Sequence, residues 1–456
     1  MKQRVYARAA LAGALFLACC GSGPQAKKRL ADTRVTILWH TSKAAYEEAL
    51  RKNPNAFDAV WSVVPAFEKE YGGRVEVLVV DWGKQRDTLV SMVRHGDSCD
   101  LAEANDQNFP LYPLKGIVRP LEGLVNLNEA PWNPGVSAAF TWGDTVYGAG
   151  AEAAPFILCY NKTLFEARGQ KTPQAYYAEG RWTWEAFRAA GIALTRRDQG
   201  LWGYGAHAAD YQVFIAGNGA QAPLAEGLDA SGFTRQGAVS AVAEAVAEAV
   251  AFLRAAYAED RYADSGCWGD LSVSRFKEGK LAMTLARGLE GLEALKGDFE
   301  IGWAPPPRGP GAAEHSTHGV VKGWCIPVTA WNPKGAAAFM TLSAALARAH
   351  ALETGARLAG PEDAAALDAL SRRVRFSPIG LGDLSKCWDA DWVVARGLRE
   401  GTAAAEFLGV ADRLIREGLA ALREEHRREQ EAWRLYGEAR ERETSWGRFL
   451  AKNARR

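Results

Sequence analysis

The sequence predicts an α/β protein of two lobes, each a mostly parallel sheet flanked by helices, with a helical extension at the C-terminus. Three observations support this fold class. Strands and amphipathic helices alternate near the N-terminus, and the apolar run Phe156–Tyr160 leads into Asn161-Lys162, as a strand crossing to the first helix of a second lobe would. The chain has 456 residues, a length that favours two moderate cores.

The first lobe is predicted from a repeated strand–helix pattern. Arg34–Trp39 forms a first strand, and apolar residues between Phe57 and Tyr71 then recur at helical spacing. Val75–Val80 is a second strand, Leu89–Val93 marks a helix, and Asp100–Ala102 begins a third strand. A βαβαβ order implies parallel strands, whose carboxyl ends carry the ligand loops.

The second lobe is predicted to be largely helical. Trp184–Thr195 and the alanine-rich Ala241–Tyr257 are its clearest helices. A further helix, Asn332–Leu346, follows later in the chain. From Ala411 onward alternating arginines and glutamates predict a charged, solvated helical tail.

The N-terminus has the pattern of an export signal. Basic residues at positions 2, 4 and 8 precede the short apolar run Ala9–Ala18. The segment that ends in Cys19-Cys20-Gly21 is similar to a bacterial lipobox, in which a cysteine receives lipid. Cys19 is the favoured lipidation site and Cys20 the alternative, while a plain signal peptide with incidental cysteines stays open. Residues 19–33 would then form a flexible basic tether.

Composition excludes several classes of function. The 55 basic residues nearly balance the 54 acidic ones, so charge gives no reason to expect a nucleic-acid partner. The remaining cysteines are scattered without metal-ligand spacing, so neither a metal site, a cofactor nor a disulfide framework is predicted. They are expected to be small buried apolar residues. The 16 tryptophans favour flat apolar ligands such as sugar rings.

A series of motifs carries a family resemblance. Tyr147-Gly148, then YNKTLF at 160–165 and TWEAF at 183–187, resembles the family 1 extracellular solute-binding proteins of bacterial ABC importers, which include maltose-binding-protein-like sugar receptors. The segments Ser274–Met283, Ile301–Pro307 and Gly319–Pro327 are similar to later elements of that family, the last being its return crossing between lobes. Cys99 and Gly150 depart from the pattern at positions where proline is usual.

The resemblance implies a two-lobe periplasmic-binding-protein fold, type II-like, with the ligand held between lobes. Its expected limits are 1–18 for the signal peptide, 34–153 with 325–375 for the N-terminal lobe, and 154–324 with 376–456 for the C-terminal lobe. The implied protein is a monomer that is exported and lipid-anchored, at the outer face of the cytoplasmic membrane, in the periplasm or at the cell surface. It would close around a carbohydrate and deliver it to the permease.

Candidate ligand residues lie at strand ends, at the crossings between lobes, in second-lobe loops and in the C-terminal part of the chain. Each also has an interpretation without ligand contact, as an aromatic residue in the core, a polar residue that only shapes a turn, or an exposed carboxylate. Gly323 is included because glycine permits close backbone approach. The set is Trp39, His40, Asn105, Asp106, Glu152, Asp210, Tyr211, Trp268, Gly323, Trp324 and Trp388.

Three other functions are alternatives to the carbohydrate receptor. A receptor for a polyol, glycerol phosphate or polyamine uses the same fold, but the sequence shows neither clustered basic residues nor several carboxylates for such ligands. A surface sensor or adhesin on this fold also stays open. An exported carbohydrate-active enzyme would need a paired acid and base; Asp106, Glu152 and Asp210 lie in no catalytic motif, so no enzyme is predicted.

Overall fold

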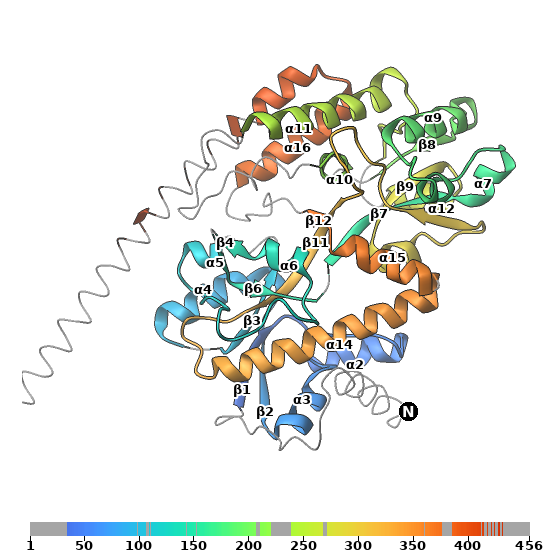
Figure 1. Ribbon diagram of the computed structural model, residues 1–456. Helices are drawn as coiled ribbons and strands as arrows, with labels where there is room; N and C mark the ends of the chain where they lie inside the picture. The colour runs from blue at the N-terminus through green and yellow to red at the C-terminus, as the bar shows by residue number, and fades with distance from the viewer. Residues whose placement is uncertain are drawn as a thin grey trace, which may run out of the picture.

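The structure is a computed structural model. It describes residues 34–97, 99–105, 109, 111–142, 144–151, 153–206, 210–219, 239–267, 271–359, 361–375 and 385–411, together with positions 413, 414, 417, 421, 424, 427, 428 and 431. Figure 1 shows two groups of elements joined by the long strands β7 (Ala153–Asn161) and β11 (Thr317–Cys325). The predicted α/β fold with its helix-flanked sheet is confirmed.

The first lobe alternates strands and helices as predicted. Its elements are β1 (Arg34–Trp39), α2 (Lys43–Lys52), α3 (Val64–Tyr71), β2 (Arg74–Val79), the 3-10 helix η1 (Trp82–Lys84), α4 (Gln85–His95), β3 (Leu101–Asn105), α5 (Leu111–Leu114), α6 (Pro134–Ala139), β4 (Thr141–Trp142), β5 (Thr145–Val146) and β6 (Gly148–Ala149).

After β7 the chain forms the second lobe, which is largely helical in its described parts. Its elements are α7 (Lys162–Ala167), α8 (Pro173–Ala178), α9 (Trp184–Leu194), η2 (Arg197–Gln199), β8 (Trp202–Tyr204), α10 (Asp210–Gly217), α11 (Val239–Arg254), the π-helix η3 (Ala255–Glu259), α12 (Leu271–Lys277), β9 (Leu281–Arg287), α13 (Gly288–Ala294) and β10 (Ile301–Ala304).

After β11 the chain returns along both lobes. The long helix α14 (Pro333–Ala359) extends well past the predicted end at Leu346 and is followed by α15 (Pro361–Ser371), β12 (Val374–Arg375) and α16 (Ser385–Glu400). Leu367 and Leu370 of α15 pack in a cluster with Ile157 of β7, which belongs to the second lobe. The lobe limits stay a prediction, but this packing associates α15 with β7 rather than with the first-lobe strands.

One continuous sheet joins the lobes in the order β2-β1-β3-β11-β7-β9-β8. β1 is parallel to both β2 and β3, while β11 runs antiparallel to β3 and β7. In the second lobe β8 and β9 are parallel, and β7 pairs antiparallel with β9 and β10. The strands therefore lie side by side from one lobe to the other, and among the described strands β11 pairs with both β3 of the first lobe and β7 of the second.

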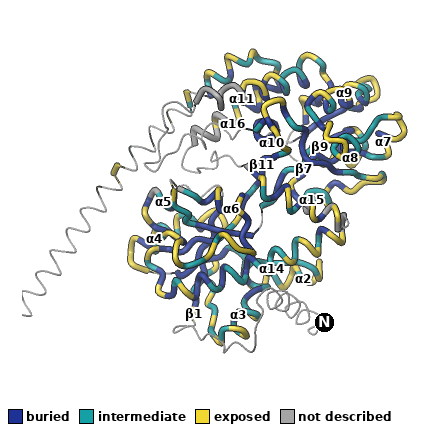
Figure 2. The backbone as a smooth tube through the Cα atoms, viewed as in Figure 1, coloured by how far each residue is buried: buried dark blue, intermediate teal, exposed yellow. Residues whose placement is uncertain are grey.

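Both faces of the sheet are covered, as its burial shows (Figure 2). Along β1, Val35, Ile37 and Trp39 pack in one cluster, whereas Leu38 packs in another on the opposite face. This alternation follows from the two-residue period of a strand. Burial on both faces makes the central strands mostly apolar. The edge strand β2 is partly exposed, with Glu76 in mid-strand, and β3 carries the buried Glu103.

The N-terminus of α7 shows how the sequence ends the crossing strand. The Asn161 side chain accepts a hydrogen bond from the backbone N–H of Leu164 at 2.9 Å, so it caps the helix. We expect Asn161→Ala to lower the free energy of unfolding by about 1 kcal/mol, measured by urea denaturation. Thr183→Ala is the control, because Thr183 stands at the N-cap of α9 without a side-chain cap bond. An equal loss in both variants would contradict the capping role.

Candidate functional site

The carboxyl ends of β1, β2 and β3 form the edge that adjoins the second lobe. Trp39 at the end of β1 pairs with Val79 at the end of β2. Asn105, the last residue of β3, pairs with Lys322 of β11, and the preceding residue, Val321, already pairs with Ala153 of β7. Groups at this edge therefore lie next to the point where the chain crosses between lobes, which is where a ligand contacting both lobes would sit.

A histidine and a buried carboxylate meet at this edge. His40 Nδ1 lies 3.0 Å from Glu103 Oε2, and Gln85 Nε2 lies 3.5 Å from the same nitrogen. The Glu103 side chain is only 1% exposed, while that of His40 is 23% exposed. His40 is thus placed as predicted, at a strand end with part of its ring in solvent. The buried Glu103 carboxylate contacts the Nδ1 atom of that ring.

Glu103 was missed by the sequence analysis. It occupies a strand whose other members are Leu101, Ala102, Ala104 and Asn105, all buried. Burying an acidic residue inside an apolar strand costs free energy unless the carboxylate has a partner. A glutamate in this apolar segment of the sequence therefore signals that such a partner exists. The partner, His40, directly follows a different strand, β1, so only the fold brings the two together.

Trp82 provides an exposed aromatic surface at the same edge. It opens η1, three residues after the end of β2, and is 49% exposed. Trp82 is not among the ligand contacts predicted from the sequence.

Trp39 and Trp324 occupy the first-lobe core instead of a binding surface. They are 6% and 4% exposed, and their ring centroids lie 5.1 Å apart. The indole N–H of Trp39 donates to Asp58 and that of Trp324 to Ser343. The expectation that these rings stack on a ligand is not supported by this packing, since neighbouring side chains already cover them.

Gly323 permits a close approach, but to the protein's own chain. A Cβ atom at this position would lie 2.6 Å from the carbonyl oxygen of Ala149 and 2.8 Å from the Phe140 ring. The glycine is required because β6 and β11 pair tightly here.

Asp210 and Tyr211 also lie in a core, that of the second lobe. Asp210 accepts a hydrogen bond from the Tyr257 hydroxyl at 2.5 Å, and its carboxylate lies 3.6 Å from Arg399 Nη2. Burial, and next the negative charge of Asp210, raise the pKa of Tyr257 well above its usual value, so this hydroxyl remains a donor. Tyr211 is 4% exposed. Both residues are therefore placed to stabilise the lobe.

The other predicted contacts fall outside the described parts of the chain. These are Asp106, Glu152, Trp268 and the side chain of Trp388, whose backbone belongs to α16. The lipidation candidates Cys19 and Cys20 lie outside them as well. The roles assigned to all of these residues stay predictions.

Comparison with known families identifies the chain. The family model described as bacterial extracellular solute-binding protein matches residues 62–372, well over half of the sequence. The chain belongs to this family. The match spans both crossing strands and the His40 partner Glu103, but ends before α16. No curated protein sequence matches this solute-binding protein.

Solved structures share the fold of this solute-binding protein. UspC of M. tuberculosis has a TM-score of 0.63 at 18% identity, covering 86% of this chain and 99% of its own. A Staphylococcus aureus extracellular solute-binding protein, solved with maltose, has a TM-score of 0.62 at 15% identity, covering 88% and 100%. A Listeria monocytogenes ABC substrate-binding protein, solved with cycloalternan, has 0.58 at 16%, covering 86% and 98%. At these identities the likeness establishes the fold.

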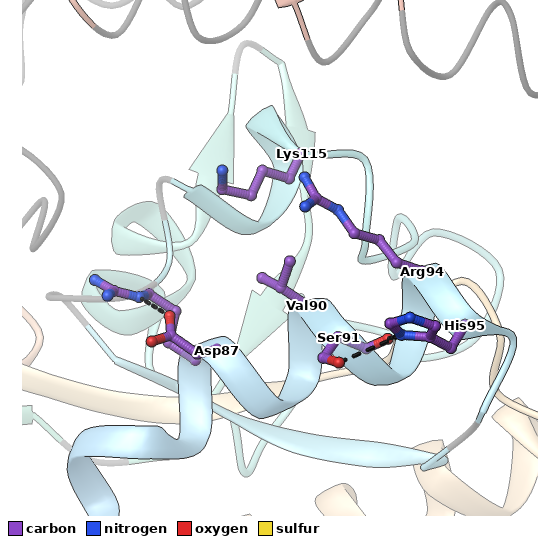
Figure 3. A pocket seen from close by; sticks show the side chains of 7 residues that line it. Asp87, Val90, Ser91, Arg94, His95 and Lys115 are labelled. Carbon is purple, nitrogen blue, oxygen red and sulfur yellow. Dashed lines mark hydrogen bonds and ion pairs between the residues drawn. The ribbon is translucent and has the colours of Figure 1, made fainter.

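A hollow of about 330 Å³ lies on the first lobe of this solute-binding protein, along α4 (Figure 3). Arg94 and Lys115 extend over Val90, and His95 bonds the Ser91 carbonyl at 2.8 Å. The hollow is lined by Arg86, Asp87, Val90, Ser91, Arg94, His95 and Lys115. All belong to the first lobe, so this hollow is not the site between lobes.

Four cysteines in the described parts of the solute-binding protein are buried, as predicted for small apolar residues, and form no disulfide with one another. They are Cys99, Cys159, Cys267 and Cys325. Burial, assisted by Asp100, raises the pKa of the Cys99 thiol to about 12, and burial raises that of Cys267 to about 11. Such thiols stay protonated at neutral pH and are inert. Within the described ranges no helix is long and apolar enough to cross a membrane, and no cluster of potential metal ligands occurs.

Proposed function

We propose that this solute-binding protein is the receptor of an ABC importer for a carbohydrate. Membership of the extracellular solute-binding protein family is the observation that supports the receptor role. The relatives solved with maltose and cycloalternan support a sugar as the ligand, and the strand-end groups His40 and Trp82 supply a hydrogen-bonding side chain and an exposed ring for one. The export signal and lipobox-like cysteines support a tethered protein outside the cytoplasm, and no catalytic turnover is proposed.

The proposed mechanism is closure about the two crossing strands. β7 and β11 connect the lobes within the sheet, so small backbone changes where Val321 pairs with Ala153 would swing one lobe toward the other. A sugar bridging both lobes would favour the closed form, because it contacts the second lobe only in that form. The closed form would then be the one that the permease recognises.

A titration panel tests this function. Tryptophan fluorescence and calorimetry would follow maltose, maltotetraose, cycloalternan, polyols, glycerol phosphate and polyamines added to the chain from Lys27 onward. Binding of a saccharide, with a smaller radius of gyration by X-ray scattering, is expected. Binding of only a polyol, phosphate or polyamine would overturn the carbohydrate assignment, and hydrolysis of a bound saccharide would overturn the receptor mechanism.

Trp82→Ala is expected to weaken saccharide binding by about 1–3 kcal/mol, by analogy with the stacking of nucleic-acid bases on aromatic side chains. Calorimetry measures the change in Kd. Trp331→Ala is the matched control, because Trp331 is also exposed but lies at the opposite end of the first lobe. If both variants keep wild-type affinity, Trp82 is not a stacking residue.

A further inference from the structure

The most exposed large apolar side chain in the described parts of the protein is Trp331, at 83%. It lies on the connection between β11 and α14, together with Val328, which is 39% exposed. Exposing an indole ring to water is unfavourable, and a large exposed apolar group often marks a contact surface.

The loop is held firmly by the first lobe. The backbone N–H of Val328 donates to the Ile117 carbonyl at 3.0 Å, and Arg119 donates to the carbonyls of Pro327 and Val328 at 3.1 and 2.5 Å. On the other side of Trp331, the Asn332 N–H donates to Asp100 at 2.7 Å. With both flanks anchored, the exposed ring is presented on a fixed backbone.

This loop lies at the end of the first lobe that is remote from the second. β11 runs antiparallel to β3, from the pair Lys322–Asn105 to the pair Cys325–Ala102, so the chain leaves it at the amino end of β3. The Asn332 side chain donates to the Arg34 carbonyl at 2.9 Å. Arg34 is the first described residue. The N-terminal segment 1–33 therefore joins the lobe directly beside Trp331.

Basic groups surround the same end. Thr329 donates to the Asp97 carbonyl at 3.3 Å, which places the loop beside the C-terminus of α4, where Arg94 and His95 lie. Lys334 and Arg94 are exposed, and Arg119 is partly exposed. The acidic groups here are Asp97, which is exposed, Glu76, which pairs with Arg34, and Asp100, which is buried and accepts backbone N–H bonds. Among the exposed and partly exposed groups named at this end, positive charge predominates.

We infer that this end of the first lobe, defined by Val328, Trp331, Arg94, Arg119 and Lys334, rests on the membrane surface that holds the tether. Tryptophan is favoured at the headgroup level of a bilayer, where its ring is apolar and its N–H stays hydrated. Lysine and arginine near the surface are attracted to anionic headgroups. The orientation directs the carboxyl edge of the sheet, with His40 and Trp82, away from the lipid. The inference rests on the proposed lipid anchor.

Hydroxyl-radical footprinting with mass spectrometry tests this orientation one tryptophan at a time. The lipidated full chain would be placed in vesicles of phosphatidylcholine and phosphatidylglycerol and compared with the same chain in detergent. We expect oxidation of Trp331 to fall several-fold in vesicles while that of Trp82, 49% exposed at the opposite edge, stays unchanged. Equal oxidation of Trp331 in both conditions, or its protection only when a permease is added, would overturn the inference.

Charge variants and flotation separate this inference from the lipid anchor. Arg94→Ala with Lys334→Ala should reduce the protection of Trp331 to the level seen on phosphatidylcholine alone, and Lys280→Ala in the second lobe should leave it unchanged. A chain that does not float with vesicles contradicts the anchor. Contact of the Trp331 surface with the membrane is then tested by measuring the same oxidation ratio with soluble protein and excess anionic vesicles. Protection of Trp331 supports the contact, and unchanged oxidation refutes it.

Discussion

Trp324→Ala is expected to lower the free energy of unfolding by about 3–5 kcal/mol, the usual cost of removing a large aromatic side chain from a core. The ring is 4% exposed and packs between Trp39 and Phe339, with centroid distances of 5.1 and 6.2 Å. Its removal leaves a cavity and deprives the buried Ser343 hydroxyl of the indole donor. Urea denaturation followed by circular dichroism measures the loss.

Trp331→Ala is the matched control for this substitution. It removes the same side chain from a position that is 83% exposed, so the change in unfolding free energy should stay within about 0.5 kcal/mol. Comparable losses in the two variants would show that Trp324 is not a core residue. A Trp324→Ala protein of wild-type stability with much weaker sugar binding would instead restore the ligand-stacking role predicted from sequence.

The framework of the fold was predictable because its signals are local. The β1–α3–β2–α4–β3 order follows from apolar periodicity, and the crossing strand β7 ends where Asn161 caps a helix. Each signal depends on residues close in sequence, and the sheet forms from strands whose order along the chain was already visible. The C-terminal limit of α14 was less predictable. Its sequence is rich in alanine beyond the predicted end at Leu346, and no helix-stop signal occurs there.

The site was less predictable because exposure depends on what covers a residue. Trp39 ends β1 and Trp82 follows β2, so both lie at strand ends. However, α3 and α14 cover Trp39, whereas Trp82 remains exposed at the edge of the sheet. The sequence contains no information at either position about the distant helix. The pairing of His40 with Glu103 is similar, since 63 positions separate them and only the parallel pairing of β1 and β3 brings them together.

Arg399→Met is expected to cost about 3–5 kcal/mol of unfolding free energy, because it leaves a buried carboxylate without its cation. Arg399 reaches the second-lobe core from α16, where its guanidinium lies 3.6 Å from Asp210 and donates to the Ala206 carbonyl at 3.2 Å. It also lies 5.0 Å from the centre of the Tyr257 ring. Both side chains of the pair are 1% exposed or less, so water cannot replace the lost charge.

Two further variants make this prediction specific to the pair. Arg396→Met, on the same helix but 64% exposed and paired only with Glu400, should cost no more than about 1 kcal/mol. Adding Asp210→Asn to Arg399→Met removes the stranded charge and should recover part of the loss, which a double-mutant cycle by urea denaturation measures. Strictly additive losses would mean that the two charges do not stabilise one another. In that case α16, which lies beyond the family match, would be held to the second lobe by its apolar contacts and by the hydrogen bond from Arg399 to the Ala206 carbonyl.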